Sequence, residues 1–149
     1  MKTELDSGDA SLIYLESLEY DCAEQQVIAV VVEGFRSLEP ETIEVGGKDF
    51  GPVHTVEPTE SSRRFRVTFT RPVAWQCVDE SFTTWNAEEE RDDTGYLQAI
   101  TKSPYRDYVM ANHGWHEDVV GPSTHYRLWT ADEVLDVVAL ESPKLEGLT

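Results

Sequence analysis

The stretch Arg64-Phe65-Arg66-Val67-Thr68-Phe69-Thr70 decides the fold class of this chain. Its three apolar residues alternate with arginines and threonines, so an extended backbone places the apolar side chains on one face and the polar ones on the other. This alternation is typical of an antiparallel strand with one buried and one solvated face. Arg71-Pro72 interrupts the pattern, and residues 73–78 form the next predicted strand, with Trp75 and Cys77 on one face. We expect these two strands to form a hairpin.

The same two-residue period extends in both directions from this pair. Upstream, residues 11–20 and 27–35 predict two strands joined by a turn at 21–24, and the second is apolar enough to be buried on both faces. A shorter strand at 42–45 ends at the turn signal Gly46-Gly47. The remaining predicted segments are a loop at 49–62 around an extended piece at 53–56, a strand at 96–100, and two strands at 125–130 and 133–139 around Ala131-Asp132.

One short helix is predicted around 103–113. Ser103 supplies an N-cap hydroxyl and Pro104 follows at the first helical position, while Tyr105, Tyr108 and Val109 form an apolar stripe and Gly114 ends the helix. Short strands with a single helix predict a mainly β, α+β fold, either an antiparallel β-sandwich or a partly closed barrel. We expect one domain over residues 1–149, with loose termini at 1–10 and 143–149.

The net charge indicates which classes of binding partner the protein favours. The 149 residues include 29 acidic and 12 basic ones, a net charge of -17, yet 40% of them are hydrophobic, so the composition is that of a folded chain. A strongly negative surface repels nucleic acid and anionic lipid and attracts basic proteins, although it also serves solubility alone. The start of the chain has no apolar run after a basic segment, and no stretch reaches the roughly 18 apolar residues of a membrane helix. These features predict a cytoplasmic protein.

Charge is distributed unevenly along the chain. Residues 63–78 contain four arginines and no acid, while residues 79–93, the acidic loop, contain seven acids and one arginine. Two interpretations of the arginines stay open: Arg64 and Arg66 pair with glutamates of an adjacent strand, or the arginines form an anion-binding patch.

The acidic loop is the candidate site for binding a protein partner, because a carboxylate cluster steers a basic protein and can mimic a phosphate backbone. Trp85 lies within the loop and is either an interface anchor or an ordinary core residue beneath a charged loop. The run 88–93 is expected to be solvated. The candidate partner-binding residues are Asp79, Glu80, Trp85, Glu88, Glu89, Glu90, Asp92 and Asp93.

An alternative function is a small metal- or ligand-binding β-domain that uses His113, His116 and His125, since imidazole nitrogens are common metal ligands. Cys22 and Cys77 belong to no CxxC pair, so we expect two buried apolar residues in preference to a disulfide or a zinc site. The chain contains no GxSxG, P-loop, HExxH or GxGxxG motif. A binding protein is therefore favoured over an enzyme, no cofactor is predicted, and no pattern specifies an oligomeric state.

A resemblance to a known group covers the C-terminal half only. The group carries an E-S-x-x-x-W/Y segment, an S-x-[FY]-x-D-Y-V helix and a closing H-Y-[RK]...[VI]-[IL]-D-V hairpin. The matching segments here are Glu80-Ser81-Phe82-Thr83-Thr84-Trp85, Ser103-Pro104-Tyr105-Arg106-Asp107-Tyr108-Val109, His125-Tyr126-Arg127-Leu128-Trp129 and Val134-Leu135-Asp136-Val137-Val138. This half resembles a group of small, uncharacterised bacterial proteins that look similar to immunity-type partners of secreted toxins. The resemblance implies a bacterial cytosolic protein and no catalytic residue.

Asp136 lies in the middle of a predicted strand, flanked on both sides by apolar residues. A buried carboxylate needs a hydrogen-bond partner, so we expect His125, Tyr126 or Arg127 to reach it across the closing hairpin.

Overall fold

The alternating strands assemble into two facing sheets in a computed structural model that describes residues 2–93 and 95–148. The first sheet has the order β1-β2-β6-β12, and β5 pairs with the end of β2. Every pairing in it is antiparallel. The strands are β1 (Leu12–Asp21), β2 (Gln26–Arg36), β5 (Val56–Glu57), β6 (Arg64–Thr70) and β12 (Lys144–Leu148).

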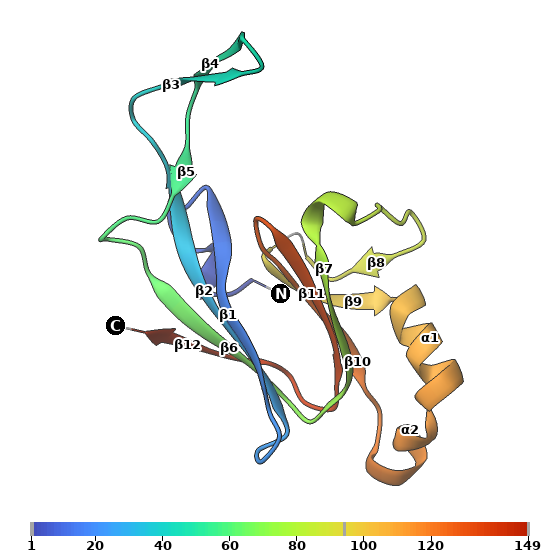
Figure 1. Ribbon diagram of the computed structural model, residues 1–149. Coiled ribbons are helices and arrows are strands. Elements are labelled where there is room, and N and C mark those ends of the chain that lie inside the picture. The colour runs from blue at the N-terminus through green and yellow to red at the C-terminus, as the bar shows by residue number, and fades with distance from the viewer. Residues whose placement is uncertain (1, 94, 149) are drawn as a thin grey trace.

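The second sheet has the order β7-β11-β10-β9-β8 and is also antiparallel. Its strands are β7 (Pro72–Asp79), β8 (Glu90–Arg91), β9 (Leu97–Lys102), β10 (Thr124–Trp129) and β11 (Glu133–Ala139). Figure 1 shows the two sheets face to face and the helices on the far side of the second sheet. The sheets do not close into a barrel, so the predicted mainly β, α+β sandwich is confirmed and the barrel alternative is wrong.

The core lies between the sheets because each contributes one apolar face. The three apolar residues of β6 are fully buried and belong to one cluster with Leu128 and Val137 of the second sheet. In β2 the residues Val27, Ala29 and Val31 point into this core, while Ile28 and Val30 on the other face are only half-buried. The prediction that β2 is buried on both faces is therefore wrong over this part of the strand, because only the inner face of the first sheet packs against the second sheet.

The hairpin predicted for β6 and β7 does not form. β6 pairs with β2 and β12, whereas β7 pairs with β11 in the other sheet. The connection is the single residue Arg71, whose φ of 54° turns the chain from one sheet to the other. Its N–H donates to the carbonyl of Gln25, and its own carbonyl accepts from the N–H of Leu140. This corner holds the two sheets together at one end, as the bond from the N–H of Ala131 to the carbonyl of Ile13 does at the other.

Both termini are more ordered than predicted. A 3₁₀ turn at Glu4–Asp6 is capped by Thr3, and Leu5 is only 2% exposed within the core cluster. At the other end, β12 continues the first sheet by pairing with β6. The prediction of loose segments at 1–10 and 143–149 is therefore wrong for these residues, because apolar burial and ladder hydrogen bonds order them. Met1 and Thr149 of those ranges lie outside the described residues.

A separate ribbon of β3 (Glu41–Val45) and β4 (Lys48–Val53) projects away from the sandwich (Figure 1). Its turn uses Gly46 and Gly47 at φ 61° and 77°, a conformation that glycine adopts without a Cβ penalty. The predicted strand at 42–45 and its turn are confirmed. The predicted loop at 49–62 is wrong in its first part, because β4 extends the ribbon and β5 begins only at Val56.

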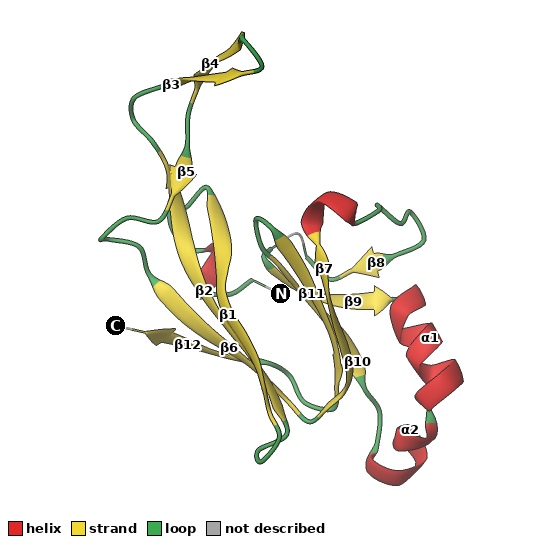
Figure 2. Cartoon of the chain, viewed as in Figure 1, coloured by secondary structure: helices red, strands yellow, loops and turns green. Residues whose placement is uncertain are grey.

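The predicted helix is confirmed as α1 (Pro104–His113), with the Ser103 hydroxyl accepting from the N–H of Arg106. Of its apolar stripe only Val109 is fully buried, and it faces the second sheet. A second short helix, α2 (Trp115–Val120), follows Gly114 and is absent from the sequence prediction. Figure 2 shows both helices on the same side of the second sheet. Within the part of the chain that the structure describes, no helix combines the length and apolarity needed to cross a membrane.

The arginines around β6 pair with carboxylates. Arg66 contacts Glu146 at the position directly opposite it on β12, and Arg64 reaches across β2 to Glu16 on β1. Arg63 binds the buried carboxylate of Glu33, and the hydrogen bond from Arg63 lowers the pKa of Glu33 despite its burial. Cross-strand pairing thus accounts for these arginines better than an anion-binding patch does.

The two cysteines are free and exposed, so the prediction that they are buried is wrong. Cys22 lies in the turn between β1 and β2. Cys77 lies on β7, which is an edge strand of the second sheet, opposite Leu135 of β11.

Substituting Leu5→Ala tests whether the N-terminal segment is part of the core. We expect a loss of about 2–5 kcal/mol in the free energy of unfolding, the usual cost of deleting a buried leucine side chain. Urea denaturation measures this, and Leu38→Ala is the matched control because Leu38 is 96% exposed. The control should change stability by less than about 0.5 kcal/mol. Equal, small effects of both substitutions would contradict the observed packing.

Candidate functional site

A row of polar side chains crosses the outer face of the second sheet. Gln98 on β9 lies opposite Arg127 on β10, Arg127 opposite Asp136 on β11, and Asp136 opposite Gln76 on β7. Residues directly opposite in antiparallel strands point to the same face, so the register alone aligns these four side chains. Three of them are nearly buried, because α1 and the acidic loop lie over this face of the sheet.

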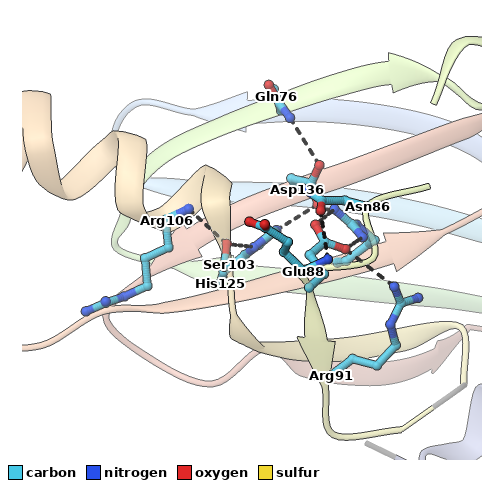
Figure 3. Close-up of polar contacts among 10 residues, drawn as sticks. Gln76, Asn86, Glu88, Arg91, Ser103, Arg106, His125 and Asp136 are labelled. Atoms are coloured by element: carbon cyan, nitrogen blue, oxygen red, sulfur yellow. Dashed lines mark hydrogen bonds and ion pairs between the residues drawn. The ribbon is translucent and has the colours of Figure 1, made fainter. Parts of the chain in front are cut away.

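Asp136 is the centre of this row, and the expectation that His125 or Arg127 reaches it is confirmed. Its Oδ1 accepts from Nε2 of His125 at 2.7 Å and from Nε of Arg127 at 2.8 Å, and its Oδ2 accepts from Nε2 of Gln76 at 3.1 Å. Figure 3 shows Gln76 and His125 converging on it. Burial raises the pKa of Asp136, but the hydrogen bond from His125 and the charge of Arg127 outweigh burial, so the net pKa is lowered.

The helix cap and His125 continue the network toward α1. The Ser103 hydroxyl lies 2.6 Å from Nδ1 of His125 and also accepts from the N–H of Arg106 at 2.9 Å (Figure 3). The hydroxyl can therefore donate its proton to Nδ1, which leaves Nε2 of a neutral imidazole to donate to Asp136.

Hydrogen bonds thus connect Ser103 to His125 and His125 to Asp136. These bonds hold α1 against the second sheet. Ser103 is 4% exposed and its oxygen is occupied by the helix cap, so it does not present a nucleophile to a substrate.

Glu89 extends the network toward the surface. Its two carboxylate oxygens accept from Nη1 and Nη2 of Arg127 at 2.6 and 3.0 Å, a bidentate pair, and its side chain is 8% exposed. The charges balance, since Asp136 and Glu89 face Arg127 and Arg91. Complete pairing of this kind is what makes burial of four charged groups tolerable.

Arg91 connects the buried pairs to an exposed aromatic ring. It contacts Glu89 at 3.4 Å, and its guanidinium carbon lies 4.6 Å from the centroid of the Trp85 ring. Trp85 itself is 73% exposed. Trp85 is therefore linked to Asp136 through Arg91, Glu89 and Arg127, while most of the ring faces solvent.

The predicted partner-binding residues divide into two groups. Glu88, Glu90 and Trp85 are exposed, whereas Glu89 is buried and paired, so the prediction of a fully solvated run at 88–93 is wrong at Glu89. Several of the others also have structural contacts. Asp79 caps the 3₁₀ turn at Glu80–Phe82, and the N–H of Glu80 donates to the carbonyl of Asp132. Asp92 accepts a hydrogen bond from the N–H of Ala99, and Asp93 also makes contacts.

A pocket of about 280 Å³ opens over the polar row, between the acidic loop and the start of α1. Asp136, Arg127, Gln76 and Tyr105 are among the residues that line it. Tyr105 packs edge-on against His125 at 5.3 Å between ring centroids, and burial raises the pKa of Tyr105 to about 12. The pocket therefore offers a phenol hydroxyl, an amide and paired charges as hydrogen-bonding groups.

The three histidines of the alternative hypothesis are not brought together. His116 uses both ring nitrogens on the carbonyl of His113 and the hydroxyl of Ser123, and His125 uses both on Ser103 and Asp136. Among residues 2–93 and 95–148, no three His, Cys, Asp or Glu side chains are grouped to hold a metal ion.

Sequence reasoning missed several residues of the site. Phe82 is 79% exposed in the acidic loop, and Arg91, Tyr96, Gln98 and Trp129 lie around Trp85. The available signal was the pair of charged residues, Arg127 and Asp136, in two otherwise apolar strands. Opposite charges on the two strands of a hairpin predict an ion pair between them. The pattern does not predict that Glu89 of the acidic loop also pairs with Arg127.

Comparison with known proteins adds no relative: the chain matches no protein-family model, no curated protein and no solved structure.

Substituting Asp136→Asn tests the buried centre. The lowered pKa means that the ionised carboxylate stabilises the fold above the unfolded-state value of about 4, and that this contribution disappears as pH falls through the lower folded-state pKa. We expect a loss of about 3–5 kcal/mol at pH 7, because His125, Arg127 and Gln76 lose a charged acceptor. The difference from the unmodified protein should shrink below about pH 4.

Urea denaturation between pH 3 and pH 7 measures both effects of Asp136→Asn. Asp49→Asn, at an exposed position of β4, is the control and should change stability by less than about 0.5 kcal/mol. Parallel stability curves for the two variants would contradict a stabilising role for Asp136.

Substituting Glu89→Gln tests whether the ion pair holds the acidic loop on the sheet. We expect the amides of residues 83–92 to exchange hydrogen at least about tenfold faster, which corresponds to about 1.4 kcal/mol of local stability. The neighbouring Glu88→Gln removes the same charge from an exposed side chain and is the matched control. Hydrogen exchange with mass spectrometry gives the readout, and unchanged protection in Glu89→Gln would rule out this anchoring.

Proposed function

We propose that this protein binds a basic protein partner through the acidic loop, with Trp85 as the central contact. The observation that carries the proposal is the exposed Trp85 ring in a loop that Glu89 anchors to the second sheet through its bidentate pair with Arg127. A loop without such an anchor would lose more conformational freedom on binding. Anchoring the loop in advance lowers that entropic cost, which favours binding.

The distribution of charge and aromatic surface supports the same function. Tryptophan supplies much of the binding energy at protein interfaces, and Phe82 adds a second exposed ring in the same loop. The exposed carboxylates of Glu88 and Glu90 lie beside these rings in sequence, within a protein of net charge -17. A negative field of this kind accelerates association with a basic partner and disfavours nucleic acid.

The partner class that fits best is a basic toxin or nuclease, so that the protein acts as an immunity-type inhibitor in a bacterial cytoplasm. A nuclease carries a positive surface because it must bind a phosphate backbone, and that surface is complementary to an array of carboxylates. The resemblance of the C-terminal half to immunity-like bacterial proteins supports this choice.

The experiment compares charge-matched variants of the protein as bait in lysate of the cells that contain it. Glu88→Gln with Glu90→Gln neutralises the acidic loop, while Glu19→Gln with Glu24→Gln removes the same charge from exposed positions near the β1–β2 turn. We expect a basic protein that is retained by the unmodified and control baits, lost from the loop variant, and released as salt is raised because screening weakens exposed charges. Equal retention by the two variants, or retention that ignores salt, would refute the proposal.

A further inference from the structure

A second pocket lies beside Trp85. It has a volume of about 370 Å³ and is mainly apolar, and the residues that line it are Trp85, Arg91, Gly95, Tyr96, Gln98 and Trp129. Three aromatic side chains around one pocket make a site for a cation or a flat group, because the faces of aromatic rings carry partial negative charge.

The chain's own arginines show which group these rings accept. The guanidinium carbon of Arg91 lies 4.6 Å from the Trp85 ring centroid, and that of Arg127 lies 6.0 Å from the Trp129 ring centroid. A planar guanidinium stacks on an indole better than an ammonium does and is more weakly hydrated. Each tryptophan of the pocket thus already contacts an arginine of this protein.

Gln98 supplies a polar acceptor in the same pocket. It is 5% exposed, and its side-chain oxygen has no hydrogen-bond partner among the described residues. A buried amide oxygen without a donor is unfavourable, so a donor that enters the pocket is favoured. Rotation about the last side-chain torsion, which has a broad energy profile, turns this oxygen toward an entering N–H group.

We propose that this pocket binds an arginine side chain of the partner, and that Arg91 is an internal occupant that competes with it. The inference rests on the proposed function and specifies the residue that the site recognises. Arg91 is the one base among the seven acids of the acidic loop, and its contact with Glu89 is longer than the contacts of Arg127 with the same carboxylate. An incoming guanidinium can therefore take the place of Arg91 against Trp85 while Glu89 stays bound to Arg127.

The test uses short peptides in which one position is varied within a glycine frame, acetyl-Gly-Gly-Arg-Gly-Gly-amide and its lysine and citrulline counterparts, at 150 mM salt. Citrulline keeps the shape of arginine without its charge. Binding is followed through the indole N–H signals of Trp85 and Trp129 in NMR spectra. We expect the arginine peptide to shift both signals, the lysine peptide to bind more weakly, and the citrulline peptide to leave them unchanged.

Variants separate the pocket from the general negative field. Arg91→Ala should tighten binding of the arginine peptide about fivefold, since a cation–π contact of about 1 kcal/mol no longer competes. Arg66→Ala on the outer face of the first sheet changes the net charge equally and should have little effect. Trp85→Ala and Gln98→Leu, followed through the Trp129 signal, should each weaken binding severalfold.

Unshifted indole signals, or equal effects of Arg91→Ala and Arg66→Ala, would overturn the inference. The lysate experiment reports separately on the proposed function. A loop-dependent partner without peptide binding would leave the proposed function intact and remove only the arginine site. Peptide binding without a loop-dependent partner would refute the proposed function and leave the arginine site in place.

Discussion

The ion pair between Arg127 and Glu89, backed by Asp136, is the interaction on which the candidate site depends. It joins the centre of the second sheet to a loop that is otherwise dominated by exposed acids. Burying these charges is costly unless each finds a partner, and the bidentate geometry meets that condition. The ion pair therefore attaches the acidic loop to a strand of the second sheet. Arg91 contacts both Glu89 and the Trp85 ring, and so links the ring to this pair.

Electrostatics act at two levels in this protein. Near the sheets, arginines pair with carboxylates, as in the contacts of Arg63 with Glu33 and Arg66 with Glu146. The excess of negative charge therefore belongs to the solvated surface, where it influences association and solubility more than folding. A surface of this kind with two exposed aromatic rings, Phe82 and Trp85, combines long-range steering with short-range apolar contact.

Features that depend on residues close together in the sequence could be predicted, and strand pairings between distant segments could not. The alternation in β6, the caps of α1 and the hairpin of β10 and β11 depend on neighbouring residues, and all three were predicted correctly. The need of Asp136 for a donor was also foreseen, because its closest candidates lie across the same hairpin. The failures in strand topology concern pairings between distant segments: β7 pairs with β11 instead of β6, and β12 and Leu5 join the sandwich.

The sequence by itself determined a mainly β chain with one capped helix, an excess of acid concentrated around Trp85, and a buried charge in the closing hairpin. Only the tertiary structure decided which acids remain exposed. Glu88 and Glu89 are indistinguishable in the sequence pattern, yet one faces solvent and the other binds Arg127, 38 positions away along the chain. The physical reason is that burial of a carboxylate is tolerated only where a guanidinium with free N–H donors can pair with it. The register of β9, β10 and β11 places the Arg127 guanidinium at that point.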